Sequence, residues 1–223
     1  CCQFDPKLGA VESNMALVDD LLKDYKPGDI QVLVLPEMAF TGYVFNGIEE
    51  IKPYLEDSKT GPTVNWSKTQ ETYQKSFLYE TDERWAIEGP GFVSVKIDKL
   101  GKVGFGICMD INPYQFKSDF FECEFANYHL EQETEIMICC MAWLKSETAE
   151  KGLLNYWALR LLPLYNKIKE GKHAYFIACN RTGLERGKQF AGTSCALDIS
   201  RESVTILEHM NHDTTGVMIT DIL

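Results

Sequence analysis

Three residues of different chemical type lie where a protein often places reactive groups. Glu37 comes just after the apolar run 30–35, Cys108 ends the run 103–107, and Lys75 lies among aromatic residues. Functional side chains concentrate at strand ends because a rigid strand fixes them while the following loop opens a cleft. A thiol nucleophile, a carboxylate base and a cation that holds an oxyanion are together sufficient for acyl transfer. We therefore treat the three as one candidate catalytic centre.

Each of the three also has an ordinary structural explanation. A glutamate after a strand often begins a helix or lies in a solvated turn. A cysteine at the end of an apolar strand is usually a packed thiol, and a lysine among aromatic residues usually extends to water or makes a cation–π contact. Only the combination of the three side chains indicates chemistry.

Apolar runs that predict strands alternate with segments of helical periodicity. Strands are expected at residues 30–35, 92–95, 104–108, 136–140, 174–179, 191–199, 204–207 and 217–219. Helices are expected at residues 15–25, at 121–128 with Ser118 as a candidate cap, and at 153–164, where Pro163 should kink or end the helix. Strands this apolar are usually covered on both faces, so we expect a layered α/β fold in a single domain, 1–223.

Composition excludes several classes of protein. The net charge of −11 argues against generic binding to nucleic acids, and no apolar run has the roughly 18–20 residues that a bilayer span needs. The eight cysteines lie mostly in apolar runs without zinc-ligand spacing, so we expect a reducing, cytoplasmic setting with no metal and no cofactor. The chain opens as if in the middle of a strand, and we expect the natural amino terminus further upstream.

Several short stretches carry a resemblance to a known family. Residues 35–38 (LPEM), 41–43 (TGY), 73–75 (YQK) and 106–110 (GICMD) resemble the nitrilase, or carbon–nitrogen hydrolase, superfamily. A narrower resemblance is to the amidases of that superfamily that act on amino-terminal Asn and Gln. It is carried by residues 77–82, 107–110, 113–114, 141–144, 155–160 and 190–194.

This resemblance implies a fold, a reaction and three catalytic roles. It implies an αββα sandwich in which Cys108 is the nucleophile, Glu37 the general base and Lys75 the oxyanion stabiliser, with the backbone N–H of Met109 as a second oxyanion donor. It further implies that amino-terminal Asn and Gln of proteins or peptides become Asp and Glu through a cysteine thioester, with release of ammonia. Such deamidation would feed the N-degron pathway of protein degradation.

The substrate-binding residues are less determined. Superfamily members often carry a second acidic residue shortly after the lysine, and Asp82 and Glu83 lie seven and eight positions beyond Lys75. A substrate ammonium needs a negative partner when it is desolvated, and Asp110 is the first candidate, with Asp82 or Glu83 as substitutes. Trp143 is expected to line the pocket.

The sequence also departs from the family pattern. Only 38 positions separate Glu37 from Lys75, residues 63–73 show no hairpin pattern, and the stretches 146–152 and 169–173 are short. We therefore expect that segments of the natural chain are absent from this sequence and that the flanking pieces are joined.

Three alternatives remain open from the sequence. One is a small-molecule amidase or carbamoylase of the same superfamily, and another is a Cys–His protease that uses Cys108 with His173. The third is a non-catalytic binding module on the same fold. The oligomeric state is not determined.

Overall fold

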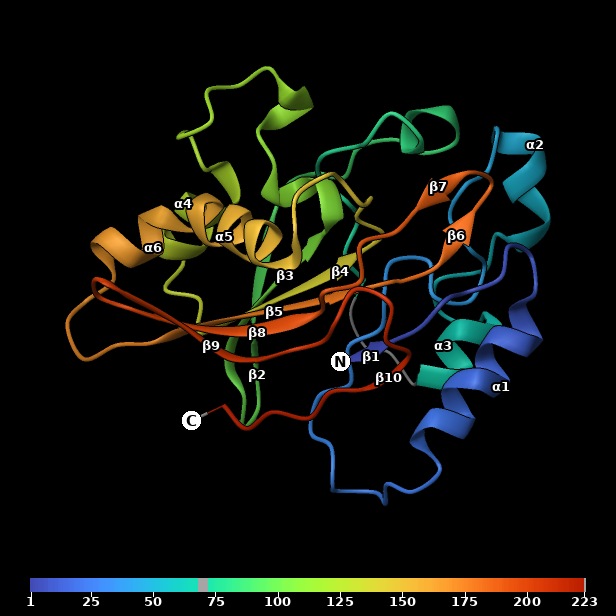
Figure 1. Cartoon of the computed structure of the whole chain (residues 1–223), viewed down its shortest axis with the longest axis horizontal. Coiled ribbons are helices and arrows are strands. Elements are labelled where there is room, and N and C mark those ends of the chain that lie inside the picture. The colour runs from blue at the N-terminus through green and yellow to red at the C-terminus, as the bar shows by residue number, and fades with distance from the viewer. Residues whose placement is uncertain (68–71, 223) are drawn as a thin grey trace.

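The computed structural model describes residues 1–67 and 72–222, and its centre is a six-stranded mixed sheet (Figure 1). The strand order is β2-β3-β4-β5-β8-β9, in which β3, β4 and β5 run parallel and the other neighbours run antiparallel. The strands are β2 (Val93–Ile97), β3 (Gly101–Ile107), β4 (Ile136–Met141), β5 (Ala174–Asn180), β8 (Cys195–Ser200) and β9 (Ser203–His209). Because three neighbouring strands are parallel, the residues that follow them meet at one edge of the sheet.

Three helices cover one face of this sheet (Figure 1). They are α4 (Glu124–Glu131), α5 (Glu150–Arg160) and α6 (Leu162–Lys167). Their apolar side chains, among them the fully buried Trp157 and Leu161, pack with sheet residues such as Phe176 into the largest hydrophobic core. The break between α5 and α6 falls at Leu161, and Pro163 lies in the first turn of α6, which confirms the predicted effect of that proline.

A smaller layer forms around the ends of the chain. Helix α1 (Val11–Leu22) packs its apolar side against β1 (Cys2–Gln3), which pairs antiparallel with β10 (Gly216–Val217). The remaining elements are α2 (Ile48–Ile51), α3 (Pro62–Ser67), the ribbon of β6 (Leu184–Glu185) and β7 (Lys188–Gln189), and short 3₁₀ turns at Lys52–Tyr54, Asp82–Arg84, Cys108–Ile111 and Tyr114–Phe116.

Two expectations about elements are wrong. Residues 30–35, all of them described, form no strand, although the carbonyl of Val34 accepts a hydrogen bond from the Cys2 N–H at 2.9 Å. An apolar run becomes a strand only where a neighbouring strand supplies a ladder of backbone hydrogen bonds, and the neighbour β1 is only two residues long.

Helix α4 begins after Cys123 rather than after Ser118, whose N–H instead closes a turn onto the Tyr114 carbonyl. The prediction about residues 63–73 falls in part on 68–71, outside the described residues.

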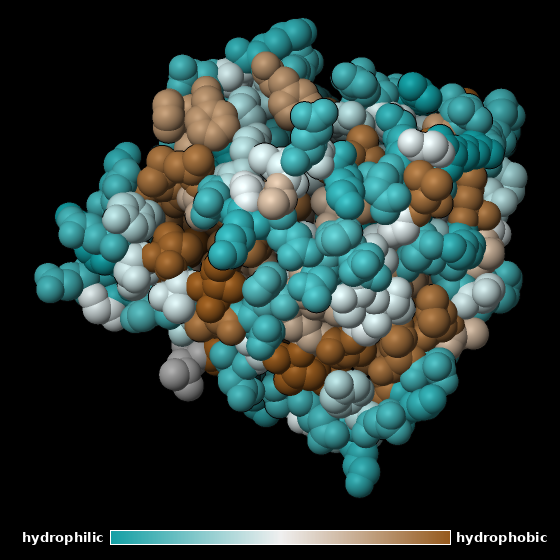
Figure 2. Space-filling view, viewed as in Figure 1, coloured by the Kyte–Doolittle hydropathy of each residue, from teal (hydrophilic) through white to brown (hydrophobic). Residues whose placement is uncertain are grey.

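The surface seen in Figure 2 is mostly hydrophilic, with bands of hydrophobic side chains between the polar ones. No helix within residues 1–67 and 72–222 is both long enough and apolar enough to cross a bilayer. All eight cysteines are free thiols.

Candidate active site

Cys108 lies at the parallel edge of the sheet, directly after β3. It begins the 3₁₀ turn Cys108–Ile111 with φ 44°, in the left-handed region that non-glycine residues rarely occupy. Such a conformation is held only where the surroundings impose it, and it is concentrated at functional sites. In the sheet register, Ile107 pairs with Cys140 of β4, so the loop after β4 lies beside the thiol.

Glu37 and Lys75 form a buried ion pair at this edge. The Lys75 Nζ donates to Glu37 Oε1 at 2.7 Å and to Asp82 Oδ2 at 2.6 Å. The second oxygen of Glu37 accepts from the Ala142 N–H at 3.0 Å, just past the end of β4. Side-chain exposure is at most 10% for all three charged groups, so their interactions are little screened by water.

Burial sets the protonation of these groups. Desolvation raises the pKa of Glu37 to about 7, against the opposing effect of the Lys75 ammonium. Burial and the Glu37 charge raise the pKa of the Cys108 thiol well above its usual value, while Lys75 and the Ala142 N–H act in the opposite direction. Burial alone would lower the pKa of Lys75, but the anionic groups around it raise the pKa overall. The resting site therefore holds a neutral thiol, a fixed cation and a carboxylate able to take up a proton near neutral pH.

The structure shows which of the two acidic residues, Asp82 or Glu83, contacts Lys75; spacing along the sequence did not decide between them. Asp82 is fully buried and accepts from Lys75 and from the Tyr79 N–H at 3.0 Å. Glu83 is exposed, because the 3₁₀ turn Asp82–Arg84 directs consecutive side chains in different directions. Asp82 is therefore the acid that contacts the lysine.

Asp110 does not fit the predicted role of ammonium ligand. It is fully buried, and its two oxygens accept from the N–H groups of Ser76 and Phe77 at 3.0 and 2.7 Å, the Ile107 N–H at 2.7 Å and the Tyr73 hydroxyl at 2.9 Å. These four bonds tie the turn at the thiol to the segment that carries Lys75. With its acceptor capacity used inside the protein, Asp110 is a positioning group.

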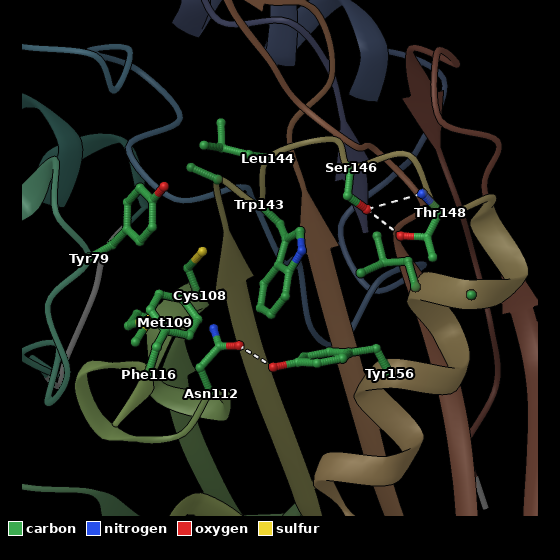
Figure 3. A pocket seen from close by; sticks show the side chains of 13 residues that line it. Tyr79, Cys108, Met109, Asn112, Phe116, Trp143, Leu144, Ser146, Thr148 and Tyr156 are labelled. Atoms are coloured by element: carbon green, nitrogen blue, oxygen red, sulfur yellow. Dashed lines mark hydrogen bonds between the residues drawn. The ribbon is translucent and has the colours of Figure 1, made fainter. Parts of the chain in front are cut away.

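A cavity of about 360 Å³ opens above Cys108, between the 3₁₀ turn and the loop after β4 (Figure 3). It is lined by Tyr79, Cys108, Met109, Asn112, Phe116, Ala142, Trp143, Leu144, Ser146, Thr148, Gly152, Leu153 and Tyr156. Trp143 is in the wall as expected; its backbone N–H donates to Asn180 Oδ1 at 2.8 Å, and its ring is edge-on to Trp157. No aspartate or glutamate is among these lining residues, so the acids predicted to bind a substrate ammonium lie outside this wall.

Asn112, Tyr156 and Tyr79 are among the cavity residues that reasoning from sequence missed. Tyr79 and Tyr156 fall in the stretches 77–82 and 155–160 that carry the family resemblance, which is the one signal available for them. Asn112 carries no such signal, because it lies between two of those stretches.

The geometry does not support a Cys–His pair. His173 precedes β5 and its Nδ1 contacts Asp198 Oδ1 at 2.7 Å, whereas Cys108 follows the parallel strand β3. The two residues are therefore at opposite edges of the sheet, separated by about 20 Å of strand.

Comparisons with known proteins agree with this architecture. No protein-family profile matches the chain. The Protein N-terminal amidase of Schizosaccharomyces pombe is 30% identical over 283 aligned positions, covering 100% of this chain and 98% of that protein. The Protein N-terminal amidase of Saccharomyces cerevisiae is 25% identical over 65% of this chain and 44% of its own length. The first alignment is longer than the 223 residues of this chain, so it contains gaps where this chain is the shorter.

Solved structures show the same fold. A crystal structure of an N-terminal amidase superposes with a TM-score of 0.81 at 20% identity, covering 96% of this chain and 95% of that one. An amidase from Nesterenkonia sp. AN1 superposes with a TM-score of 0.70 at 16% identity, covering 100% and 91%. These likenesses confirm the nitrilase-like α/β fold, and the full-length match at 30% identity shows that this chain belongs to the protein N-terminal amidase family of the nitrilase superfamily.

Proposed function

We propose that this protein removes the side-chain amide of amino-terminal Asn and Gln in proteins and peptides, with Cys108 as nucleophile, Glu37 as base and Lys75 as oxyanion stabiliser. The observation that carries the proposal is the buried contact of Lys75 with Glu37 and Asp82 at the sheet edge where the strained Cys108 lies. The name that both curated relatives carry supports the substrate class. N-terminal amidase structures containing Gln-Val and Asn-Glu-Ala peptides share the fold.

The proposed reaction uses groups of this chain and water. Glu37 takes the Cys108 proton as Sγ bonds to the carboxamide carbon, and the resulting oxyanion is held by the Lys75 ammonium and the Met109 N–H at the start of the 3₁₀ turn. Glu37 returns the proton to the leaving nitrogen, so ammonia departs and a thioester remains. Glu37 then takes a proton from water as the water attacks the thioester carbon. The carbon–sulfur bond breaks and Glu37 passes this proton to Sγ, which restores the thiol and releases an amino-terminal Asp or Glu.

The wider setting is part of the same proposal. The product carries a new negative charge next to its amino terminus, which is a change that a recognition protein of the N-degron pathway can read. Eight free thiols suit a reducing compartment, and we therefore place the enzyme in the cytoplasm.

One observation favours an alternative within the superfamily, a small-molecule amidase or carbamoylase. The described cavity wall contains no carboxylate that could pair with a substrate ammonium. The net charge of −11 attracts a cationic substrate only in a general way.

The deciding experiment compares peptides that begin with Asn or Gln and carry either a free or an acetylated amino terminus, with ammonia release as the readout. We expect hydrolysis of the free peptides, a rate at least about tenfold lower on the acetylated forms, and loss of activity in Cys108→Ala and Lys75→Ala. Equal rates on both forms would support the small-molecule amidase. No ammonia from any amide would support the non-catalytic module.

A further inference from the structure

Asn112 lies in the cavity wall in an orientation set by one short hydrogen bond. It follows the 3₁₀ turn that begins at Cys108 and is 4% exposed. Its side-chain oxygen Oδ1 accepts from the Tyr156 hydroxyl at 2.6 Å. This distance suits an O–H···O bond and is short for N–H···O, so the oxygen of the amide faces Tyr156 and the Nδ2 group faces away. Partial burial raises the pKa of Tyr156, which keeps the hydroxyl protonated and able to donate.

Helix α5 holds this pair in place. Tyr156 and Arg160 lie one turn apart on the same face of the helix, and the Arg160 Nε donates to the Ile111 carbonyl at 2.7 Å. Arg160 is itself buried and paired with Glu124 at 3.1 Å. Helix α5 thus fixes Ile111, the last residue of the turn, and Asn112, which follows it, and this is the arrangement expected for a group that positions a substrate.

The Nδ2 group of Asn112 is left without a protein partner. No acceptor for it is found within residues 1–67 and 72–222, and Figure 3 shows this nitrogen directed toward Cys108, into the cavity. This nitrogen is open to the cavity rather than enclosed by protein, so a ligand that supplies an acceptor there can replace water as its partner. The ligand atom must be an acceptor, because a substrate ammonium would bring donor against donor.

We propose that Asn112 binds the carbonyl oxygen of the first peptide bond of the substrate, with Tyr156 as its positioning residue. The inference rests on the proposed function, in which the side-chain carboxamide oxygen is already held by Lys75 and the Met109 N–H. The carbonyl of the first peptide bond is then the nearest remaining acceptor of an amino-terminal Asn or Gln. Because a simple amide lacks this carbonyl group, the contact would make the enzyme bind a peptide more tightly than a simple amide.

The test compares two ligands in a protein that cannot turn them over. One is a peptide beginning with Asn, and the other replaces its first peptide bond by an uncharged alkene, which removes only the carbonyl oxygen and the N–H. Dissociation constants are measured by calorimetry on Cys108→Ala, with and without Asn112→Ala. We expect the peptide to bind about tenfold more tightly than the alkene when Asn112 is present, and equally well when it is absent.

Two further variants separate positioning from general stability. Tyr156→Phe should weaken peptide binding about threefold and leave alkene binding unchanged, because Asn112 loses its anchor. Tyr165→Phe on α6 removes a hydroxyl that has no hydrogen bond among the described residues and should change neither constant. Asn112→Asp keeps the shape but presents only oxygen, and should bind the peptide no better than Asn112→Ala.

Equal affinity for the two ligands with Asn112 present, or binding of neither, would overturn the inference. A uniform loss for both ligands in Asn112→Ala would show a structural role and would also overturn it. Ammonia release by the wild-type protein reports on the proposed function separately. If the wild-type protein deamidates the peptide but Cys108→Ala binds the peptide and the alkene equally well, the proposed function stands. The role of Asn112 is then wrong.

Discussion

The chemistry of the candidate site depends on one cation between two carboxylates. Lys75 contacts Glu37 and Asp82 through the same ammonium group. Burial and the Asp82 charge raise the pKa of Glu37 to about 7, against the opposing effect of the Lys75 ammonium. A base with a pKa near the working pH is the most effective for proton transfer. Desolvation makes the ion pair costly to bury. It also raises the pKa of Glu37, which makes this carboxylate a better acceptor for a thiol proton.

Wild-type activity should therefore decline as pH falls through about 7, because protonated Glu37 cannot accept the Cys108 proton. Asp82→Asn removes a negative charge beside Glu37, so the pKa of Glu37 decreases and this decline moves to lower pH. Asp82→Asn should also lower kcat/KM about tenfold or more, since Lys75 loses one of the two groups that orient it. The measurement is kcat/KM for an Asn peptide from pH 5 to 9.

Glu83→Gln is the matched control for this prediction, since it makes the same change in charge one residue away at the exposed surface. Its pH profile should coincide with that of the wild type. A profile shifted as much by Glu83→Gln as by Asp82→Asn would contradict the assignment of Asp82.

At the scale of elements, the position of Cys108 depends on how closely α4 approaches β3. Gly104 and Gly106 of β3 face this helix, and a Cβ built on Gly106 would lie 2.8 Å from Cε2 of the Phe125 ring. Phe125 is fully buried in the main core and has no room to withdraw. The two glycines therefore set the spacing that places the end of β3 and the turn that follows it.

Gly106→Ala should lower the free energy of unfolding by about 1–3 kcal/mol, because the added methyl group overpacks the contact with Phe125. It should also lower kcat, since the clash is two residues from Cys108, the proposed nucleophile. Urea unfolding and ammonia release measure the two effects. Gly47→Ala is the control, because a Cβ there meets no atom within 4 Å, and it should change neither quantity. Equal stability of the two variants would contradict the close packing.

At the scale of the whole molecule, a buried ion pair joins segments far apart in sequence. Glu185 Oε2 contacts the Arg181 guanidinium at 2.9 Å, and its Oε1 accepts from the N–H groups of Tyr43 and Val44 at 2.9 and 2.5 Å. Arg181 also donates to the Pro6 carbonyl at 2.8 Å. The loop after Glu37, the amino-terminal segment and the β6–β7 ribbon are thus held together by one charged pair.

Removal of one member of this pair should be costly. Glu185→Ala leaves two backbone N–H groups buried without their acceptor and the Arg181 charge with only the more distant Asp5 carboxylate, 3.8 Å away, so we expect a loss of about 3–5 kcal/mol in the free energy of unfolding. Thermal and urea unfolding test it, with the exposed Glu208→Ala as control. A loss below about 1 kcal/mol for Glu185→Ala would show that water or a rearranged side chain replaces the carboxylate.

The strands around the site were predictable because their signal is local. Runs such as 104–108 and 136–140 are apolar enough to predict buried strands, and the end of the first run predicted the position of Cys108. Residues 30–35 carry the same local signal and form no strand, because pairing depends on a partner elsewhere in the chain. Helix α4 begins later than expected for a similar reason, since a candidate cap at Ser118 is used by a turn instead.

The sequence by itself determined the family, and it predicted Cys108, Glu37 and Lys75 as the catalytic residues. Only the tertiary structure decided that Asp82 rather than Glu83 contacts Lys75. It also decided that the Asp110 oxygens accept hydrogen bonds from the protein itself and that the Nδ2 group of Asn112 points into the cavity. The physical reason is that residue type and apolar runs are local properties, whereas burial and hydrogen-bond partners are not. Tyr156 lies 44 positions from the Asn112 it orients, and no spacing along the chain encodes that contact.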